Sequence, residues 1–289
     1  MRPISAPEIL PPGSGYGPSV AANEPAPQPV RKPKPWWKTS LATYLLVGIN
    51  CAVFAYMVAH KVSAFNPTVA QLMHYGADNA GIVLVDGEWW RIVSAMFVHV
   101  GIIHLATNMW CLWNLGLLAE PLMGAWGVLA VYILTGAAGN LLSTCVNWIW
   151  YHQDWNRFHD VAVFPAGAGA SGAVFGIAGA LIILLNSKRL PVPPIELKKL
   201  RRSVIYFAGL NLIIGFSVSV GTSVIGTGIN IDNMAHLGGF TCGLLFAGPM
   251  VPRFGSPLGD FQLRLRIAVA TVVLLLVLFG FYLAQLPRG

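Results

Sequence analysis

Seven apolar stretches, each close to the roughly 20 residues that a helix needs to cross a bilayer, constrain this chain more than any other feature. They cover residues 41–60, 102–120, 126–148, 171–187, 203–220, 234–250 and 266–286. The fourth stretch is short and rich in glycine, and the third is loosely bounded. The pattern predicts an all-α, multi-pass integral membrane protein.

The composition agrees with this interpretation. Apolar residues make up 55% of the chain and charged residues only 10%, against roughly 25% charged in a soluble domain. So few charges exclude an ordinary soluble protein, and the high hydrophobicity excludes a largely disordered one. The cysteines do not suggest a disulfide scaffold, because each lies inside an apolar run. These are Cys51, Cys111, Cys145 and Cys242.

The first 38 residues differ from the rest. Half of the 20 prolines fall there among Ser, Gly, Ala and Gln, a composition that predicts a disordered cytoplasmic tail over 1–38. The segment has no apolar region near Met1 that would mark a cleavable signal peptide. We expect two further parts, a six-helix core over 39–250 and a cytoplasmic loop with a seventh spanning helix over 251–289.

The basic residues predict the orientation. With the N-terminus inside, all of the 18 Lys and Arg residues except Lys61, Arg91, Arg157 and Arg288 fall in cytoplasmic segments. The positive-inside rule therefore predicts a cytoplasmic N-terminus and an external C-terminus. The same distribution argues against a nucleic-acid partner for this chain of net charge +7, because the basic residues mark loops. The external segment 61–101 is interpreted either as a loosely ordered loop or as an interfacial structure, and its adjacent Trp89 and Trp90 favour the second.

Polar residues inside the spans suggest function, since they are costly in lipid. His104 and Asn108 lie early in the second span, Ser171 begins the fourth, and His236 lies in the first turn of the sixth. These three spans all run from outside to inside, so the four side chains are expected at a similar depth below the outer face. A neutral imidazole can take the proton of a serine, which is a weak nucleophile otherwise.

Spacing supports a common site. His104 and Asn108 are four apart and share a helix face, where they can offer donors to an oxyanion together with the amides that begin the fourth span. The pairs Gly172/Gly176 and Gly239/Gly243 let two membrane helices approach closely. His99 and His104 are five apart, which does not favour a metal pair. Asp232 is either a triad acid orienting His236 or a solvated loop charge, and the second is the expected role.

At these positions the sequence resembles the rhomboid family of intramembrane serine proteases. The matching motifs are Glu88-Trp89-Trp90-Arg91 with His99, His104-x-x-x-Asn108, Gly169-Ala170-Ser171-Gly172-Ala173-Val174-Phe175-Gly176 and Ala235-His236-x-x-Gly239-x-x-x-Gly243. They cover roughly 41–250 in the family's order. The seventh span resembles the six-plus-one arrangement of part of the family.

The resemblance implies a serine endopeptidase that cleaves transmembrane segments of other membrane proteins near the outer face. Ser171 would be the nucleophile and His236 the base, with His104 and Asn108 in the oxyanion hole. Phe175, tyrosine in some members, would pack on His236, and Gly169, Gly172, Gly239 and Gly243 would support the site. No metal or organic cofactor is implied. The expected partners are transmembrane substrates and the lipid bilayer, and the expected location is a bacterial inner membrane.

Two other classes remain open from the residues alone. A non-catalytic membrane protein could bind client spans in the same groove, and it would not need Ser171. A small-solute transporter would show an inverted repeat with broken helices. The transporter ranks lower, because the polar cluster lies toward one face.

Overall fold

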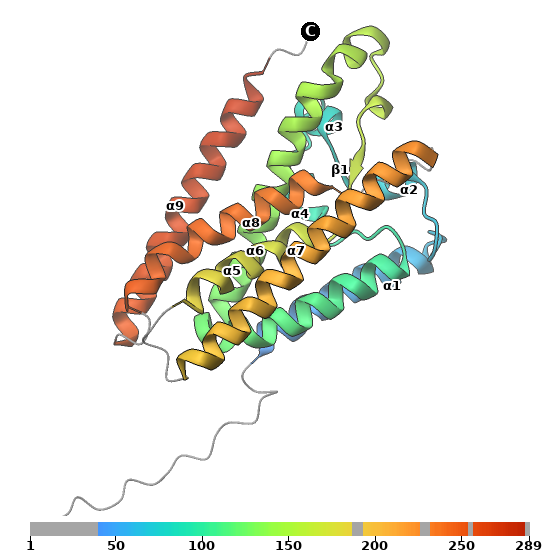
Figure 1. Cartoon of the computed structure of the whole chain (residues 1–289). Coiled ribbons are helices and arrows are strands. Elements are labelled where there is room, and N and C mark those ends of the chain that lie inside the picture. Colours follow the sequence, from blue (N-terminus) through green and yellow to red (C-terminus); the bar gives the residue numbers. More distant parts are fainter. Residues whose placement is uncertain (1–39, 187–192, 226–231, 254–256, 287–289) are drawn as a thin grey trace, which may run out of the picture. The chain divides into compact units, whose positions relative to one another are not determined.

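The computed structural model describes residues 40–186, 193–225, 232–253 and 257–286, so the predicted tail over 1–38 lies outside the described residues. Helices dominate the rest (Figure 1). The α-helices are α1 (Leu41–Ala59), α2 (Val69–His74), α3 (Ala80–Leu84), α4 (Arg91–Ser94), α5 (Ile102–Phe158), α6 (Ser171–Leu184), α7 (Pro194–Ile225), α8 (Asn233–Ala247) and α9 (Leu258–Ala284). Two 3₁₀ helices, η2 (Val161–Val163) and η3 (Gly248–Arg253), and two short strands, β1 (Asp78–Asn79) and β2 (Ala166–Gly167), complete the described elements.

Several of the predicted spans correspond directly to helices. The helices α1, α5 and α9 are long and apolar enough to cross a membrane, and α6 is a shorter apolar helix. The second and third predicted spans are joined in α5, 57 residues long, which is broken at Gly124. Gly124 has a φ of 74°, a conformation that favours glycine, and Pro121 nearby lacks the N–H that would continue the helix. The membrane-protein class is thus supported, while the six-plus-one count remains a prediction.

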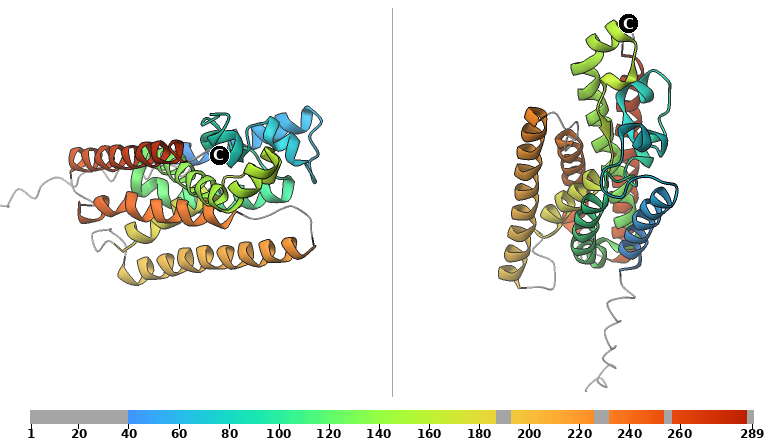
Figure 2. Two further views of the ribbon diagram at one scale, coloured as in Figure 1. Left: turned by 90° about the horizontal axis from the view of Figure 1, so that it is seen from above. Right: turned by 90° about the vertical axis from the view of Figure 1, so that its right-hand side faces the viewer.

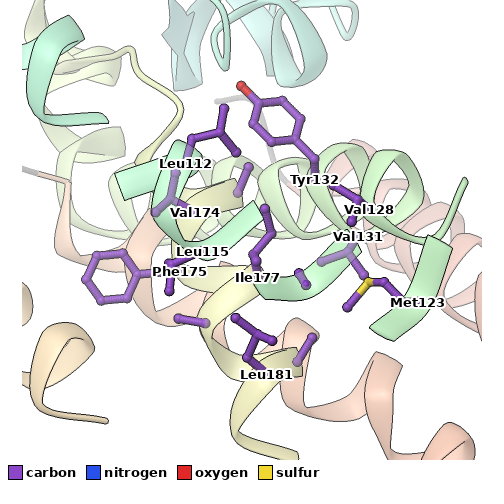
Figure 3. Packing of buried hydrophobic residues seen from close by; sticks show 14 of the residues in the cluster. Leu112, Leu115, Met123, Val128, Val131, Tyr132, Val174, Phe175, Ile177 and Leu181 are labelled. Atoms are coloured by element: carbon purple, nitrogen blue, oxygen red, sulfur yellow. The ribbon is translucent and has the colours of Figure 1, made fainter. Parts of the chain in front are cut away.

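Helix α6 lies at the centre of the packing. Every residue from 172 to 181 is buried, as expected for a helix that is apolar on all sides. It packs on both halves of α5 and on α8. Figure 3 shows this core, where Leu112 and Leu115 from the first half of α5 and Val128 and Val131 from the second half surround Ile177. The serine at the start of α6 is therefore held by a rigid buried element.

Glycines bring α6 and α8 into direct backbone contact. A Cβ atom added at Gly239 would overlap the carbonyl oxygen of Gly172, and one added at Gly243 would overlap that of Gly176. The two small-residue pairs of the sequence therefore face each other. This contact sets the separation of the two helices that carry Ser171 and His236.

Helices α7 and α9 flank this core. Helix α7 lies at the periphery in both views of Figure 2 and packs against α6 and α8. It begins at Pro194, nine residues before the predicted span over 203–220, because the polar segment before that span is also helical. Helix α9 packs against α5, α8 and η3.

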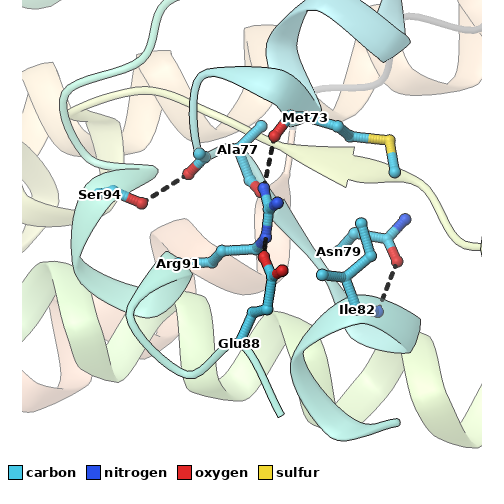
Figure 4. Close-up of polar contacts among 8 residues, drawn as sticks. Met73, Ala77, Asn79, Ile82, Glu88, Arg91 and Ser94 are labelled. Carbon is cyan, nitrogen blue, oxygen red and sulfur yellow. Dashed lines mark hydrogen bonds and ion pairs between the residues drawn. The ribbon is translucent and has the colours of Figure 1, made fainter. Parts of the chain in front are cut away.

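The segment 61–101 is an ordered structure built around one arginine (Figure 4). The buried Arg91 side chain donates to Glu88 Oε2 at 2.7 Å and to the carbonyl oxygens of Met73 and Ala77 at 2.6 and 3.0 Å. Ser94 Oγ donates to the Gly76 carbonyl at 2.7 Å. The interpretation as a loosely ordered loop is wrong, because these bonds fix α2 and α4 to each other.

A buried glutamate joins α1 to α5. The carboxylate of Glu120, 3% exposed, accepts from the Ala42 and Thr43 amides at 2.8 and 2.9 Å and from Thr43 Oγ1 at 2.7 Å. These amides begin α1, so Glu120 satisfies donors that a helix N-terminus leaves unpaired and adds a favourable charge there. The first span is thereby fixed to the core.

Candidate active site

Ser171 and His236 form a direct hydrogen bond. The distance between His236 Nε2 and Ser171 Oγ is 2.8 Å. Ser171 is the first residue of α6, and His236 lies in the first turn of α8 with 5% of its surface exposed. Residues 65 positions apart in the sequence thus meet at the N-terminal ends of two packed helices. A serine hydroxyl bonded to an imidazole is the arrangement that nucleophilic catalysis requires.

The His236 ring is held in a fixed orientation by packing. It stacks on the Phe175 ring, with centroids 4.4 Å apart and an interplanar angle of 15°. Phe175 lies one turn after Ser171 on α6, so one helix supplies both the hydroxyl and the aromatic surface. The Gly172 Cα lies against α8 as well, since a Cβ there would be 3.2 Å from the Ala235 carbonyl oxygen. The ring therefore has little freedom to turn away from Ser171.

His104 approaches the same site from the first turn of α5. A Cβ added at Gly169, whose φ is 131°, would lie 2.5 Å from His104 Cε1. The imidazole therefore lies against the backbone two residues before Ser171. The Val100 amide donates to His104 Nδ1 at 3.5 Å, which places the proton of a neutral ring on Nε2. That nitrogen is then a donor, as an oxyanion hole needs.

Asn108 lies one turn further along α5. Its side chain is 6% exposed, and Nδ2 donates to the His104 carbonyl at 2.9 Å. A side-chain amide carries two N–H bonds, so one remains beyond this intrahelical bond. The first-turn amides of α6 are also unpaired within the helix, and Ala170 at its N-cap provides no side-chain acceptor. His104 and these amides are donors close to Ser171, and Asn108 lies one helical turn from His104.

Asp232 has a different role from either one expected. Its Oδ1 accepts from the Ala235 amide at 2.9 Å and its Oδ2 from Ser143 Oγ at 2.5 Å. It therefore caps α8 and binds α5. The expectation that Asp232 is a solvated loop charge is wrong. Among the described residues His236 Nδ1 has no hydrogen-bond partner, so none of them extends the Ser171–His236 pair through that atom. Within the same residues, no three His, Cys, Asp or Glu side chains gather where they could hold a metal ion.

The sequence reasoning missed the polar contacts at β1, beside the strand that precedes Ser171. Asp78 in β1 is buried and accepts from Thr144 Oγ1 of α5 at 3.0 Å. Strand β1 pairs with β2, with Asp78 opposite Gly167. A polar residue in a loop gives no signal of burial, so these partners could be recognised only from the tertiary structure.

Comparisons with known proteins match this chain to one family. The sequence model of the Rhomboid domain matches residues 86–253. The chain is 31% identical to Rhomboid protease AarA of Providencia stuartii over 209 residues, covering 71% of this chain and 70% of that protein. It is 29% identical to Rhomboid protease GluP of Bacillus subtilis (strain 168) over 233 residues, which are 80% of this chain and 38% of GluP.

The similarity extends to plants, with 29% identity to RHOMBOID-like protein 1 of Arabidopsis thaliana over 70% of this chain and 45% of that protein. The chain thus spans less than half the length of some of the relatives that it matches. The matched domain contains all four polar residues of the candidate site and covers more than half of the sequence. The chain belongs to the rhomboid family.

Proposed function

We propose that this protein is an intramembrane serine endopeptidase that cleaves transmembrane segments of other membrane proteins. The observation that carries the proposal is the 2.8 Å hydrogen bond between Ser171 Oγ and His236 Nε2. Two relatives named as rhomboid proteases support it at the level of the family.

The reaction would begin when His236 Nε2 takes the proton of Ser171 as Oγ attacks the scissile carbonyl carbon. The carbonyl oxygen becomes an oxyanion, which His104 Nε2–H, Asn108 and the first amides of α6 would stabilise. The tetrahedral intermediate collapses as the imidazolium gives its proton to the leaving amine. Water then hydrolyses the acyl-enzyme, with His236 again as base.

The membrane arrangement is part of the proposal. Six spans over 39–250 would form the core and the helix within 251–289 a seventh span, with 1–38 as a cytoplasmic tail and the C-terminus outside. The site would then lie below the outer face of a bacterial inner membrane, where a cavity could admit water. Substrate spans with Gly, Pro or polar residues near their outer end would unwind at least cost.

A substrate would enter laterally, past the first half of α5 or past α7. The Trp110 and Phe207 rings, 6.5 Å apart between centroids, join these two helices. Trp110 is 64% exposed on the surface of the bundle, so this contact is accessible from the lipid.

The proposal is tested with purified protein in liposomes that also contain a helix-unstable transmembrane substrate. Wild type, Ser171→Ala and His236→Ala are compared for a new N-terminus in the product. We expect cleavage near the outer end of the substrate span by wild type alone. If all three proteins bind the substrate and leave it intact, the chain is a non-catalytic binder. Equal cleavage by the two variants would overturn the assignment of the dyad.

A further inference from the structure

Two aspartates outside the dyad converge on the strand that leads to Ser171. Strand β2 includes Gly167, four residues before the serine. A Cβ added at Gly167 would lie 3.4 Å from Asp232 Oδ2 and 3.6 Å from Asp78 Cβ. Asp78 pairs with Gly167 in the β1–β2 ladder, while Asp232 caps α8. Both aspartate side chains therefore lie within van der Waals contact of the same point on β2.

Helix α5 supplies a hydroxyl to each carboxyl group. Thr144 Oγ1 donates to Asp78 Oδ2 at 3.0 Å, and Ser143 Oγ donates to Asp232 Oδ2 at 2.5 Å. Asn147 Nδ2 in turn donates to Ser143 Oγ at 3.2 Å. Four segments therefore meet here: β1, β2, α5 and the start of α8. Two of them lead directly into the helical turns that carry Ser171 and His236.

We infer that Asp78 and Asp232 share a proton and act as positioning residues for the dyad, joining the β2 strand before Ser171 to the N-terminus of the helix that carries His236. The inference rests on the proposed function. With one proton present, the pair is a single negative charge held by hydroxyl donors. When both groups ionise, they repel each other across Gly167 and separate the segments that they join.

The charges around the pair favour this protonation. Burial, followed by the Asp232 charge, raises the pKa of Asp78 to about 7, although the Thr144 bond opposes the shift. Burial also raises the pKa of Asp232, against the bonds from Ser143 and Ala235. The Arg91 guanidinium on α4 faces Asp78. Its charge lowers the Asp78 pKa, but it is the smallest of the contributions to that pKa. The Arg91 guanidinium is bonded to Glu88 and to two carbonyl oxygens.

The sign of the pH effect follows from the raised pKa. Between the ordinary aspartate value and about 7, the folded protein holds a proton on Asp78 that the unfolded chain has lost. The stability contributed by this proton is complete at low pH and is lost as the pH rises through 7. At pH 8 about one-tenth of the Asp78 side chains would remain protonated, so kcat should fall about tenfold from its maximum.

The experiment measures kcat and KM for substrate cleavage in liposomes from pH 5 to pH 9. Asp78→Asn keeps an acceptor for Thr144 but cannot ionise, and Asp232→Asn keeps a helix cap of equal quality. We expect wild type to lose kcat above pH 7 with KM unchanged, and either variant to lack this decline. The double variant should match the single ones. Asp86→Asn, at an exposed aspartate of the same segment, is the control and should keep the wild-type profile.

Failure of this inference can be distinguished from failure of the proposed function. If kcat of Asp78→Asn still declines above pH 7 while Ser171→Ala is inactive, the positioning role of the aspartate pair is overturned. The proposed protease function then still holds. A role in folding alone would lower kcat equally at every pH. If wild type cleaves nothing, the thermal unfolding midpoint still reports on the pair. This midpoint should fall between pH 5 and pH 8 in wild type and stay level in Asp78→Asn. If the midpoints of the two proteins change in parallel with pH, the proposed sharing of a proton is refuted.

Discussion

Replacing Gly239 by alanine tests whether the backbone contact between α6 and α8 sets the catalytic geometry. The added methyl group would overlap the Gly172 carbonyl oxygen, which is a backbone atom next to Ser171 and cannot turn aside as a side chain could. The two helices would have to separate by about 1 Å or more, and a displacement of that size can lower a catalysed rate by ~10²-fold. Overpacking of this kind lowers the free energy of unfolding by about 1–3 kcal/mol. We therefore expect a folded protein with a large loss of kcat.

The matched control is Gly248→Ala at the other end of α8, where an added Cβ has no atom within 4 Å. Cleavage in liposomes is measured from the new N-terminus of the product. Folding is measured by thermal unfolding in detergent. The control should cleave at the wild-type rate. Wild-type kcat in Gly239→Ala, with an unchanged unfolding midpoint, would refute the claim that this contact holds Ser171 against His236.

Three further predictions follow from single contacts. Phe175→Tyr should retain most of its activity because the ring still stacks on His236, whereas Phe175→Ala should lower kcat and leave substrate binding intact, as measured by kcat and KM. Glu120→Ala removes the acceptor of three donors at α1 and should destabilise the protein by several kcal/mol, at ~1–3 kcal/mol for each unpaired group; a thermal midpoint equal to that of wild type would contradict the reasoning. Asn108→Ala should reduce kcat by up to ~10²–10³-fold, the effect of one oxyanion donor, and a much smaller loss would assign that role to His104 or to the α6 amides.

The sequence predicted the positions of α1 and α9 and the gathering of Ser171, His236 and His104 because these features stand out locally. A continuous apolar run marks a spanning helix whatever surrounds it. A polar side chain in such a run is conspicuous, and the predicted shared direction of three spans indicates a similar depth for these side chains. The glycine pairs then bring α6 and α8 together, as the structure shows at Gly239 and Gly172.

The fold of residues 61–101 and the full length of α7 were harder to predict from the sequence. In the loop, order depends on Arg91 reaching carbonyl oxygens 14 and 18 residues earlier in the chain, and no periodic pattern encodes such bonds. In α7 the helix extends through a charged segment that begins at Pro194. A hydropathy criterion stops where the charges begin, although backbone hydrogen bonding continues.

The aspartate pair shows why a positioning role is harder to predict than a catalytic one. Asp78 and Asp232 lie in polar surroundings in the sequence, where an acidic residue is ordinarily a solvated charge. Their hydroxyl partners are 66 and 89 residues away, and Ser143 and Thr144 are small residues of the kind found on many packed membrane helices. A carboxyl group acquires a raised pKa only when the fold removes its water and places a second carboxyl group beside it. Both conditions arise from the same helix packing that joins Ser171 to His236, so the predicted pH dependence and the catalytic geometry should respond together when that packing is disturbed.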